Sequence, residues 1–130
     1  FCLSMGNPHA VFFVRSLAEI DVDVLGPIFE NHLIFPEKAN ISFAQVLSKS
    51  KIKMKVWERG VGITKACGSG ACAVAVAAKQ LSKIGSFCEI SLDGGKLNVH
   101  LPDNDNIYLT GPIEISFRGE LSQRLSNLIK

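Results

Sequence analysis

Alternation of apolar and polar residues predicts most of the strands in this chain. The clearest case is Lys51–Trp57, where Ile52, Met54 and Val56 alternate with lysines, as in a strand with one buried face. The lysines are expected on the solvated face, where they also blunt a sheet edge. Further strands are predicted at Phe1–Met5, Ala10–Val14, Asn40–Leu47, Phe87–Leu92, Lys96–Leu101, Ile107–Leu109 and Ile113–Phe117.

A peripheral helix is predicted early in the chain, at Val22–Asn31. Its apolar residues recur at helical spacing, and Asp21 or Asp23 can serve as the N-cap. Pro27 is expected early in this helix, where its missing N–H is tolerated. A short helix or tail is expected at Leu121–Ile129.

A second helix is predicted from about Ser69 to Ser82 or Lys83, with Gly85 as the residue that follows its C-terminal end. Residues 71–78 read Ala-Cys-Ala-Val-Ala-Val-Ala-Ala. A helix that is apolar all round has to be buried on every side. The elements together predict an α+β fold, in which seven or eight mostly antiparallel strands form a sheet or barrel around this central helix.

The composition is that of a globular domain. The 130 residues are 47% hydrophobic and 20% charged, with a formal net charge of +2. No basic stripe with interleaved aromatics indicates nucleic-acid binding, and no apolar run approaches the ~20 residues of a membrane span. There is no signal-peptide pattern. The chain begins at Phe1 and opens directly into a predicted strand, which suggests a fragment or a processed product.

The four cysteines are Cys2, Cys67, Cys72 and Cys88. None forms a C-x-x-C pair and no histidine lies at zinc-like spacing, which argues against a structural metal. A domain with this much apolar content does not need disulfides, so the thiols are expected to be reduced and the protein cytoplasmic. Cys2 and Cys88 fall in predicted strands, and Cys72 is expected to point into the core.

Cys67 stands at the start of the apolar helix, in Thr64–Ala73. The small residues Gly68, Ser69 and Gly70 leave the first-turn N–H groups open to a ligand. A helix N-terminus stabilises an anion by roughly 0.3–1 kcal/mol and lowers the pKa of a thiol. The same N–H groups can hold a carboxylate or a phosphate. The alternative is an inert buried thiol, because free cysteine is among the most buried residue types.

Two other polar groups punctuate the apolar strands. Asn7 and His9 lie in the turn Gly6-Asn7-Pro8-His9, where turn chemistry explains an asparagine as well as function does. Glu58 and Arg59 end the predicted 51–57 strand and are followed by two glycines, as in a loop that folds back tightly. Adjacent charges of this kind usually belong to the surface. Local chemistry therefore leaves both interpretations open.

Five motifs occur together along the chain: Ser4-Met5-Gly6-Asn7-Pro8-His9, Phe35-Pro36 with Asn40, Val56-Trp57-Glu58-Arg59-Gly60-Val61-Gly62, Ala66-Cys67-Gly68-Ser69-Gly70-Ala71-Cys72-Ala73, and Thr110-Gly111-Pro112. In this order they resemble the C-terminal half of the diaminopimelate epimerases, over nearly the whole chain. The resemblance implies that residues 1–130 form the C-terminal catalytic lobe of a two-lobe enzyme, whose N-terminal lobe is absent from this chain.

The resemblance also implies a reaction. These bacterial isomerases convert LL-diaminopimelate to the meso form, in lysine and peptidoglycan biosynthesis, without a cofactor or a metal. One cysteine, as thiolate, removes the α-proton, and a second cysteine, as thiol, protonates the opposite face. The family implies a homodimer for the complete protein and diaminopimelate as the small-molecule ligand. Neither nucleic acid nor membrane is expected as a partner, on the composition described above.

Site residues follow from the same resemblance. Cys67 matches the second catalytic cysteine, which is the proton acceptor for one stereoisomer and exchanges roles in the reverse direction. The backbone N–H groups of Gly68 and Ser69 match those that hold the α-carboxylate. The remaining matched positions are the substrate-binding Asn7, Asn40, Glu58 and Arg59, and the pKa-tuning His9 and Glu58. Arg59 would pair with a carboxylate and Glu58 with an ammonium group. Ser69 stands where threonine is expected, and the other catalytic cysteine belongs to the absent lobe.

Two other functions remain open at this point. A related racemase, such as a proline racemase, would share the fold, although the run Trp57-Glu58-Arg59-Gly60 argues against it. The chain by itself is also compatible with a non-catalytic, substrate-binding lobe, since one base cannot serve both faces of a carbon.

Overall fold

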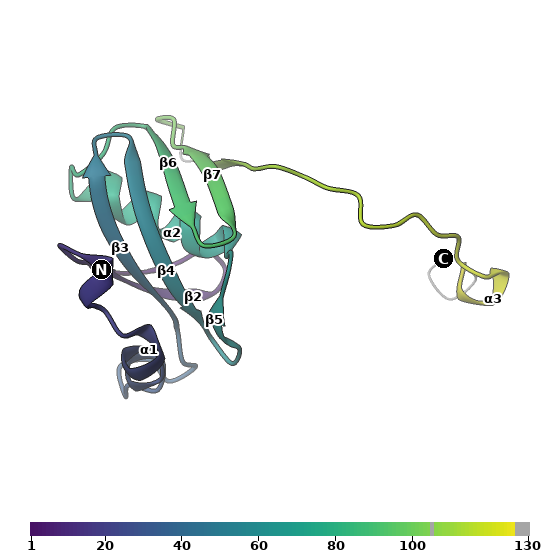
Figure 1. Ribbon diagram of the computed structural model, residues 1–130, viewed down its shortest axis with the longest axis horizontal. Coiled ribbons are helices and arrows are strands. Elements are labelled where there is room, and N and C mark those ends of the chain that lie inside the picture. The colour runs from purple at the N-terminus through teal and green to yellow at the C-terminus, as the bar shows by residue number, and fades with distance from the viewer. Residues whose placement is uncertain (105, 127–130) are drawn as a thin grey trace.

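The computed structural model describes residues 1–104 and 106–126. Its centre is helix α2 (Gly68–Gln80), around which a sheet curls (Figure 1). The strands are β1 (Cys2–Ser4), β2 (Pro8–Phe13), β3 (Asn40–Ser48), β4 (Lys51–Glu58), β5 (Gly62–Thr64), β6 (Phe87–Leu92), β7 (Gly95–His100) and β8 (Tyr108–Thr110). They are ordered β1-β2-β3-β4-β6-β7-β8, with β5 paired to β4. The predicted α+β class is confirmed.

Most pairings between these strands are antiparallel, as predicted. The exceptions are β2–β3 and β4–β6, which are parallel. Parallel neighbours need a crossover connection. The first crossover carries the 3-10 helix η1 (Leu17–Glu19) and helix α1 (Val22–Glu30), and the second carries β5 and α2. Each crossover therefore contributes one of the two main helices.

The two helices cover opposite faces of the sheet. Ile52, Met54 and Val56 of β4 are buried in the core that contains α2, as their alternation predicts. The other face packs on α1, where the rings of Phe12 and Phe29 stack at 4.5 Å between centroids. β4 pairs on both sides, with β3 and with β5 and β6, so its lysines do not blunt an edge, contrary to expectation.

Helix α1 agrees with its predicted range and cap. The Asp21 side chain accepts a hydrogen bond from the Val24 N–H at 3.2 Å. Pro27, however, lies in the helix interior and not in the first turn. The helix continues for one turn beyond it, and the Asn31 Nδ2 donates back to the Pro27 carbonyl at 2.7 Å.

Helix α2 ends earlier than predicted. The left-handed residue after it is Ser82, with φ of 54°, and not Gly85. The Ser82 N–H donates to the Lys79 carbonyl at 2.9 Å and the Lys83 N–H to that of Ala78 at 2.8 Å, which is a Schellman motif. The helix is also not buried on every side, because Cys72 and Val76 are only half-buried.

The chain leaves the sheet after β8 as an extended segment that leads to α3 (Gln123–Ser126), away from the body of the molecule (Figure 1). The strand predicted at Ile113–Phe117 is not formed. Its apolar residues Ile113, Ile115 and Phe117 are 96%, 69% and 86% exposed. Of the helix or tail predicted at Leu121–Ile129, residues 127–129 lie outside the described residues.

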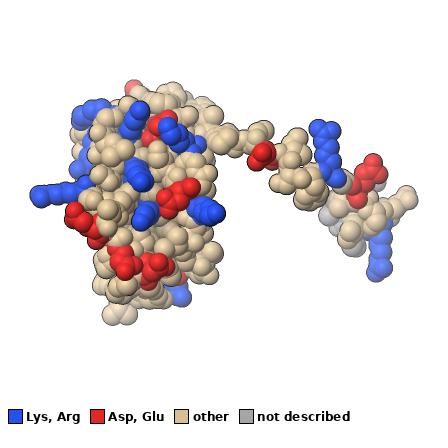
Figure 2. Space-filling model, in the orientation of Figure 1, with Lys and Arg blue, Asp and Glu red and all other residues tan. Residues whose placement is uncertain are grey.

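No helix within residues 1–104 and 106–126 is long and apolar enough to cross a membrane. Lys and Arg side chains lie among Asp and Glu on the face of the body seen in Figure 2.

The contact between α1 and β4 yields a stability prediction. A Cβ at Gly26 would lie 2.5 Å from Cγ and Cδ2 of Trp57. Gly26→Ala should therefore destabilise the protein by about 1–3 kcal/mol through overpacking, as measured by urea denaturation. Gly85→Ala is the matched control, because no heavy atom lies within 4 Å of its Cβ position. Equal stability of the two variants would contradict this packing.

Candidate active site

Cys67 is the N-cap of α2. Its Sγ accepts a hydrogen bond from the Gly70 N–H at 3.4 Å and lies 3.6 Å from the Ser69 hydroxyl. A cysteine here takes the place of the oxygen-bearing residues that usually cap helices. The Cys67 side chain is buried, with 6% of its surface exposed. The prediction that this thiol lies at the start of the core helix is confirmed.

A row of polar residues crosses the sheet on the face that packs against α2. His9 of β2 is paired with Asn40 of β3. Ile41 of β3 pairs with Trp57 of β4. Because these strands are antiparallel, Asn40 lies opposite Glu58. The sequence places these three residues in separate motifs, and the strand pairing brings them into one row.

His9 is the most buried member of this row. It is 1% exposed, and its Nε2 lies 3.0 Å from the Asn7 Oδ1. Burial lowers the pKa of His9, an effect opposed by the negative charge of Glu58 and reinforced by the positive charge of Arg59. The imidazole is therefore neutral at pH 7, and its Nε2 is the donor to Asn7.

Asn40 links two turns. Its Nδ2 donates to the Pro8 carbonyl and its Oδ1 accepts from the Arg59 N–H, both at 3.0 Å. The side chain is buried, with 4% exposed. These contacts use one amide hydrogen and one lone pair. A contact between Asn40 and substrate would have to use the second amide hydrogen or the second lone pair of Oδ1.

Glu58 and Arg59 point to different surroundings. The Thr64 hydroxyl donates a short hydrogen bond to the Glu58 carboxylate, which also lies next to the Cys67 thiol. Arg59 is exposed, and its Nη1 donates to the Glu37 carbonyl at 3.0 Å. Thr64 belongs to β5, a three-residue strand that the alternation analysis did not identify.

The pKa of the Cys67 thiol is raised, contrary to the effect expected of the helix N-terminus. Burial is the largest cause, and the hydrogen bond and charge of Glu58 add to it. The contacts with Ser69 and with the Gly70 N–H act in the opposite direction. Desolvation thus outweighs the helix end, and Cys67 is a thiol at neutral pH in this structure.

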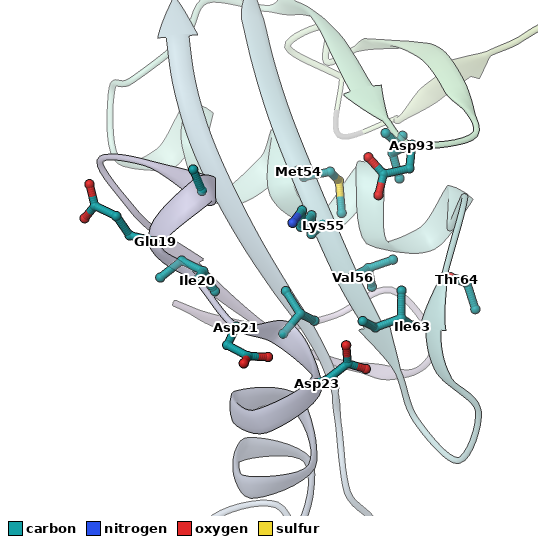
Figure 3. Close-up of a pocket in the computed structure, with 13 residues that line it drawn as sticks. Glu19, Ile20, Asp21, Asp23, Met54, Lys55, Val56, Ile63, Thr64 and Asp93 are labelled. Atoms are coloured by element: carbon teal, nitrogen blue, oxygen red, sulfur yellow. The ribbon is translucent and has the colours of Figure 1, made fainter.

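A cavity of about 400 Å³ lies beside this site but is not part of it (Figure 3). It is bounded by the start of α1, by β4 and β5, and by the β6–β7 turn, and its lining includes Glu19, Asp23, Lys55 and Asp93. Cys67, His9 and Glu58 do not line it. Among residues 1–104 and 106–126, no three His, Cys, Asp or Glu side chains are arranged to hold a metal ion.

The environment of Cys67 predicts the behaviour of a Glu58→Gln variant. Removing the carboxylate charge should lower the pKa of the thiol, so the pH profile of Cys67 alkylation by iodoacetamide should move to lower pH. Mass spectrometry of the Cys67 peptide measures it. Glu19→Gln, which removes an exposed carboxylate, should leave the profile in place. An unchanged profile in Glu58→Gln would contradict the assigned contact.

Burial of His9 predicts a pH-dependent stability. Because its pKa in the folded state lies below the ordinary 6.5, the unfolded state binds more protons as the pH falls. The contribution of neutral His9 is complete above pH 6.5 and is lost as the pH falls through the folded-state pKa. His9→Gln should flatten the dependence measured by urea unfolding between about pH 5 and 8, whereas exposed His32→Gln should not. The same slope in both variants would contradict this.

The sequence of this chain matches a known protein family. The family model described as diaminopimelate epimerase matches residues 1–116. The diaminopimelate epimerase of Rhodospirillum centenum is 49% identical over 95% of this chain and 43% of its own length. That of Microcystis aeruginosa is 50% identical over 91% of this chain and 42% of its own length. The chain thus spans less than half the length of these curated relatives.

Solved structures share the fold at lower identity. A PhzC/PhzF-type phenazine biosynthesis protein from Clostridium difficile superposes with a TM-score of 0.65 and 20% identity, over 95% of this chain and 44% of that one. A PhzF-family protein from Enterococcus faecalis gives a TM-score of 0.58 and 16% identity, over 75% and 35%. These likenesses concern the fold alone. On the match to residues 1–116 and the identity to the curated relatives, the chain belongs to the diaminopimelate epimerase family.

Proposed function

We propose that this chain is the C-terminal lobe of a diaminopimelate epimerase and supplies one of the two cysteines that invert the α-carbon. The observation that carries the proposal is the position of Cys67, which caps α2 next to the Glu58 carboxylate at the end of the row formed by His9, Asn40 and Glu58. Membership of the family supports diaminopimelate as the proposed substrate and epimerisation as the proposed reaction.

The proposed reaction moves one proton without a cofactor. A thiolate on one face of the α-carbon takes the α-proton and leaves a carbanion, and a thiol on the other face gives up its S–H proton to that carbanion. One thiolate and one thiol remain, with their roles exchanged. The raised pKa of Cys67 suits the thiol that delivers the proton, while the opposite cysteine, in the absent lobe, acts as the base.

The start of α2 is suited to hold the α-carboxylate. The first amide groups of a helix have no partner within it. Those of Gly68 and Ser69 precede the Gly70 N–H that bonds to Cys67. A carboxylate bound there would lie beside the thiol, at the positive end of the helix. Serine in place of threonine keeps the same N–H group and a hydroxyl.

Glu58 and Arg59 are proposed to bind charged groups of the substrate. The exposed guanidinium of Arg59 is available to a carboxylate, and the half-buried Glu58 to an ammonium group. Asn7, whose Oδ1 lies against His9, completes the proposed substrate contacts together with Asn40. In this scheme His9 and Glu58 tune the protonation of the catalytic thiols, and Glu58 lies next to Cys67.

An N-terminal lobe of the same protein is the proposed partner of this chain. The exposed Ile113, Ile115 and Phe117 would be covered by it, and the relatives are more than twice as long as the aligned segment. The complete protein is proposed to form a homodimer. We place the reaction in the cytoplasm, because it requires reduced thiols and all four cysteines, each among the described residues, are free.

Replacement of Cys67 tests this function. In the complete enzyme, Cys67→Ala should reduce inversion of LL-diaminopimelate by about 10³-fold or more, because one of the two proton-transfer groups is lost. Cys72→Ala, a change of the same kind five residues further along α2, should keep most of the activity. The assay is the formation of the meso form by chiral chromatography.

Undiminished turnover by Cys67→Ala would refute the catalytic role of this cysteine. Turnover of proline by the unsubstituted enzyme, without turnover of diaminopimelate, would instead indicate a proline-racemase-like activity on the same fold.

A further inference from the structure

Glu30 is a buried carboxylate that the proposed reaction does not use. It lies at the last position of α1 and is 5% exposed. Its Oε2 accepts a hydrogen bond from the Trp57 Nε1 at 2.7 Å, and its Oε1 accepts one from the Gly60 N–H at 2.8 Å. A buried carboxylate is costly unless it is hydrogen-bonded in this way. Both oxygens are thus directed at the end of β4 and the turn that follows it.

That turn carries the charged residues of the candidate site. It follows Glu58 and reverses the chain from β4 into β5, with a 3.0 Å hydrogen bond from the Val61 N–H to the Glu58 carbonyl. Gly60 has φ of 75°, a left-handed conformation that favours glycine. Arg59 and Gly60 therefore turn their amide groups away from the strand ladder and toward side chains of other elements.

Two successive amide groups of the turn are held by two different elements. The Arg59 N–H donates to Asn40 of β3 at 3.0 Å, and the Gly60 N–H donates to Glu30 of α1. Behind them, Trp57 is fixed between Glu30 and the bare backbone of Gly26, since no Cβ fits between the indole and the helix. Glu30 is the group that connects α1 both to the turn and to the preceding strand residue.

We propose that Glu30 is a positioning residue of the epimerase site, which fixes the Glu58–Gly60 turn so that the Glu58 carboxylate lies beside Cys67 and Arg59 faces the substrate. The proposal rests on the proposed function. Glu30 touches neither Cys67 nor, in this arrangement, the substrate, and acts through Trp57 and Gly60.

The chemistry of the contact explains why glutamate is required. Both partners of Glu30 are N–H donors, so each of its two oxygens must accept. Glutamine offers one oxygen and one NH₂ group, and the NH₂ group would face a second donor. One of the two hydrogen bonds would be lost, and a buried N–H would be left without its acceptor. Aspartate keeps two acceptors but is one methylene shorter.

The test compares Glu30→Gln with Glu19→Gln in the complete enzyme. Release of the turn should raise the KM for diaminopimelate on the order of tenfold or more, because misplacement of binding groups weakens substrate contacts. It should also move Glu58 away from Cys67, so the pH profile of Cys67 alkylation should shift to lower pH, as in Glu58→Gln. Glu19→Gln, at an exposed site on η1, should change neither quantity.

A double variant separates positioning from a general loss of stability. The groups that face Cys67 are Glu58 of β4 and Ser69, Gly70 and Cys72 of its own helix. If Glu30 acts through Glu58, then Glu30→Gln combined with Glu58→Gln should shift the alkylation profile no further than Glu58→Gln alone. Additive shifts, or an unchanged profile and KM in folded Glu30→Gln, would overturn the proposal.

A second variant and the alkylation profile test Glu30 even if Glu30→Gln does not fold or the enzyme does not invert diaminopimelate. If Glu30→Gln does not fold, Trp57→Phe removes one donor and leaves the Gly60 contact, and a smaller shift in the same direction is expected; no shift would count against Glu30. If the unsubstituted enzyme does not invert diaminopimelate, the proposed function fails, while the alkylation profile still measures the link from Glu30 to Cys67.

Discussion

The structure depends on one contact inside an otherwise apolar core. The N-terminus of α2 lies against the row of polar residues formed by His9, Asn40 and Glu58. The sheet curls around helix α2, whose small side chains allow close packing against β2, β3 and β7. The N-terminus of such a helix leaves donors that need partners. Here the Cys67 thiol takes one of them, and the polar row on β2, β3 and β4 lies at the same end. The Cys67 thiol thereby lies beside the Glu58 carboxylate, in a row that also holds the buried His9 imidazole.

Burial decides the state of that thiol. The helix end and the Ser69 contact favour the thiolate, but desolvation and the Glu58 charge favour the thiol more strongly. In the proposed two-cysteine reaction, such a thiol is suited to be the proton donor. The same balance makes the position of Glu58 important, because a small movement of this carboxylate changes the pKa of the sulfur. Asn40 and Glu30 hold the turn that follows Glu58, and this is how the proposed positioning of the carboxylate would act.

Local patterns predicted the parts of the fold that depend on local physics. The alternation in Lys51–Trp57 predicts its strand, and the sequence before α1 offers Asp21 or Asp23 as the cap, of which Asp21 forms it. Strand periodicity and capping are short-range. The end of α2 was misplaced because Ser82 adopts the left-handed conformation that favours glycine. Ile113–Phe117 alternates like a strand but has no neighbouring strand in the described chain, and a strand needs a partner.

The geometry of the candidate site could be predicted only in part. The motif resemblance names Cys67, His9, Asn40 and Glu58 as site residues, and the strand register explains why His9, Asn40 and Glu58, far apart in sequence, lie in one row. The local sequence around Glu30 does not indicate its role, because its hydrogen-bond partners lie 27 and 30 residues away. The direction of the shift in the Cys67 pKa also depends on burial, which is a property of the folded chain.

The most direct test of the central claim is the exchange of the α-proton of one stereoisomer of diaminopimelate with deuterated water, followed by ¹H NMR. This chain alone should be compared with the complete protein. Exchange and inversion are expected of the complete protein and neither of the chain alone, because the proposed second cysteine belongs to another lobe. Exchange catalysed by the chain alone would contradict a two-cysteine site and would mean that Cys67 deprotonates the substrate without a partner.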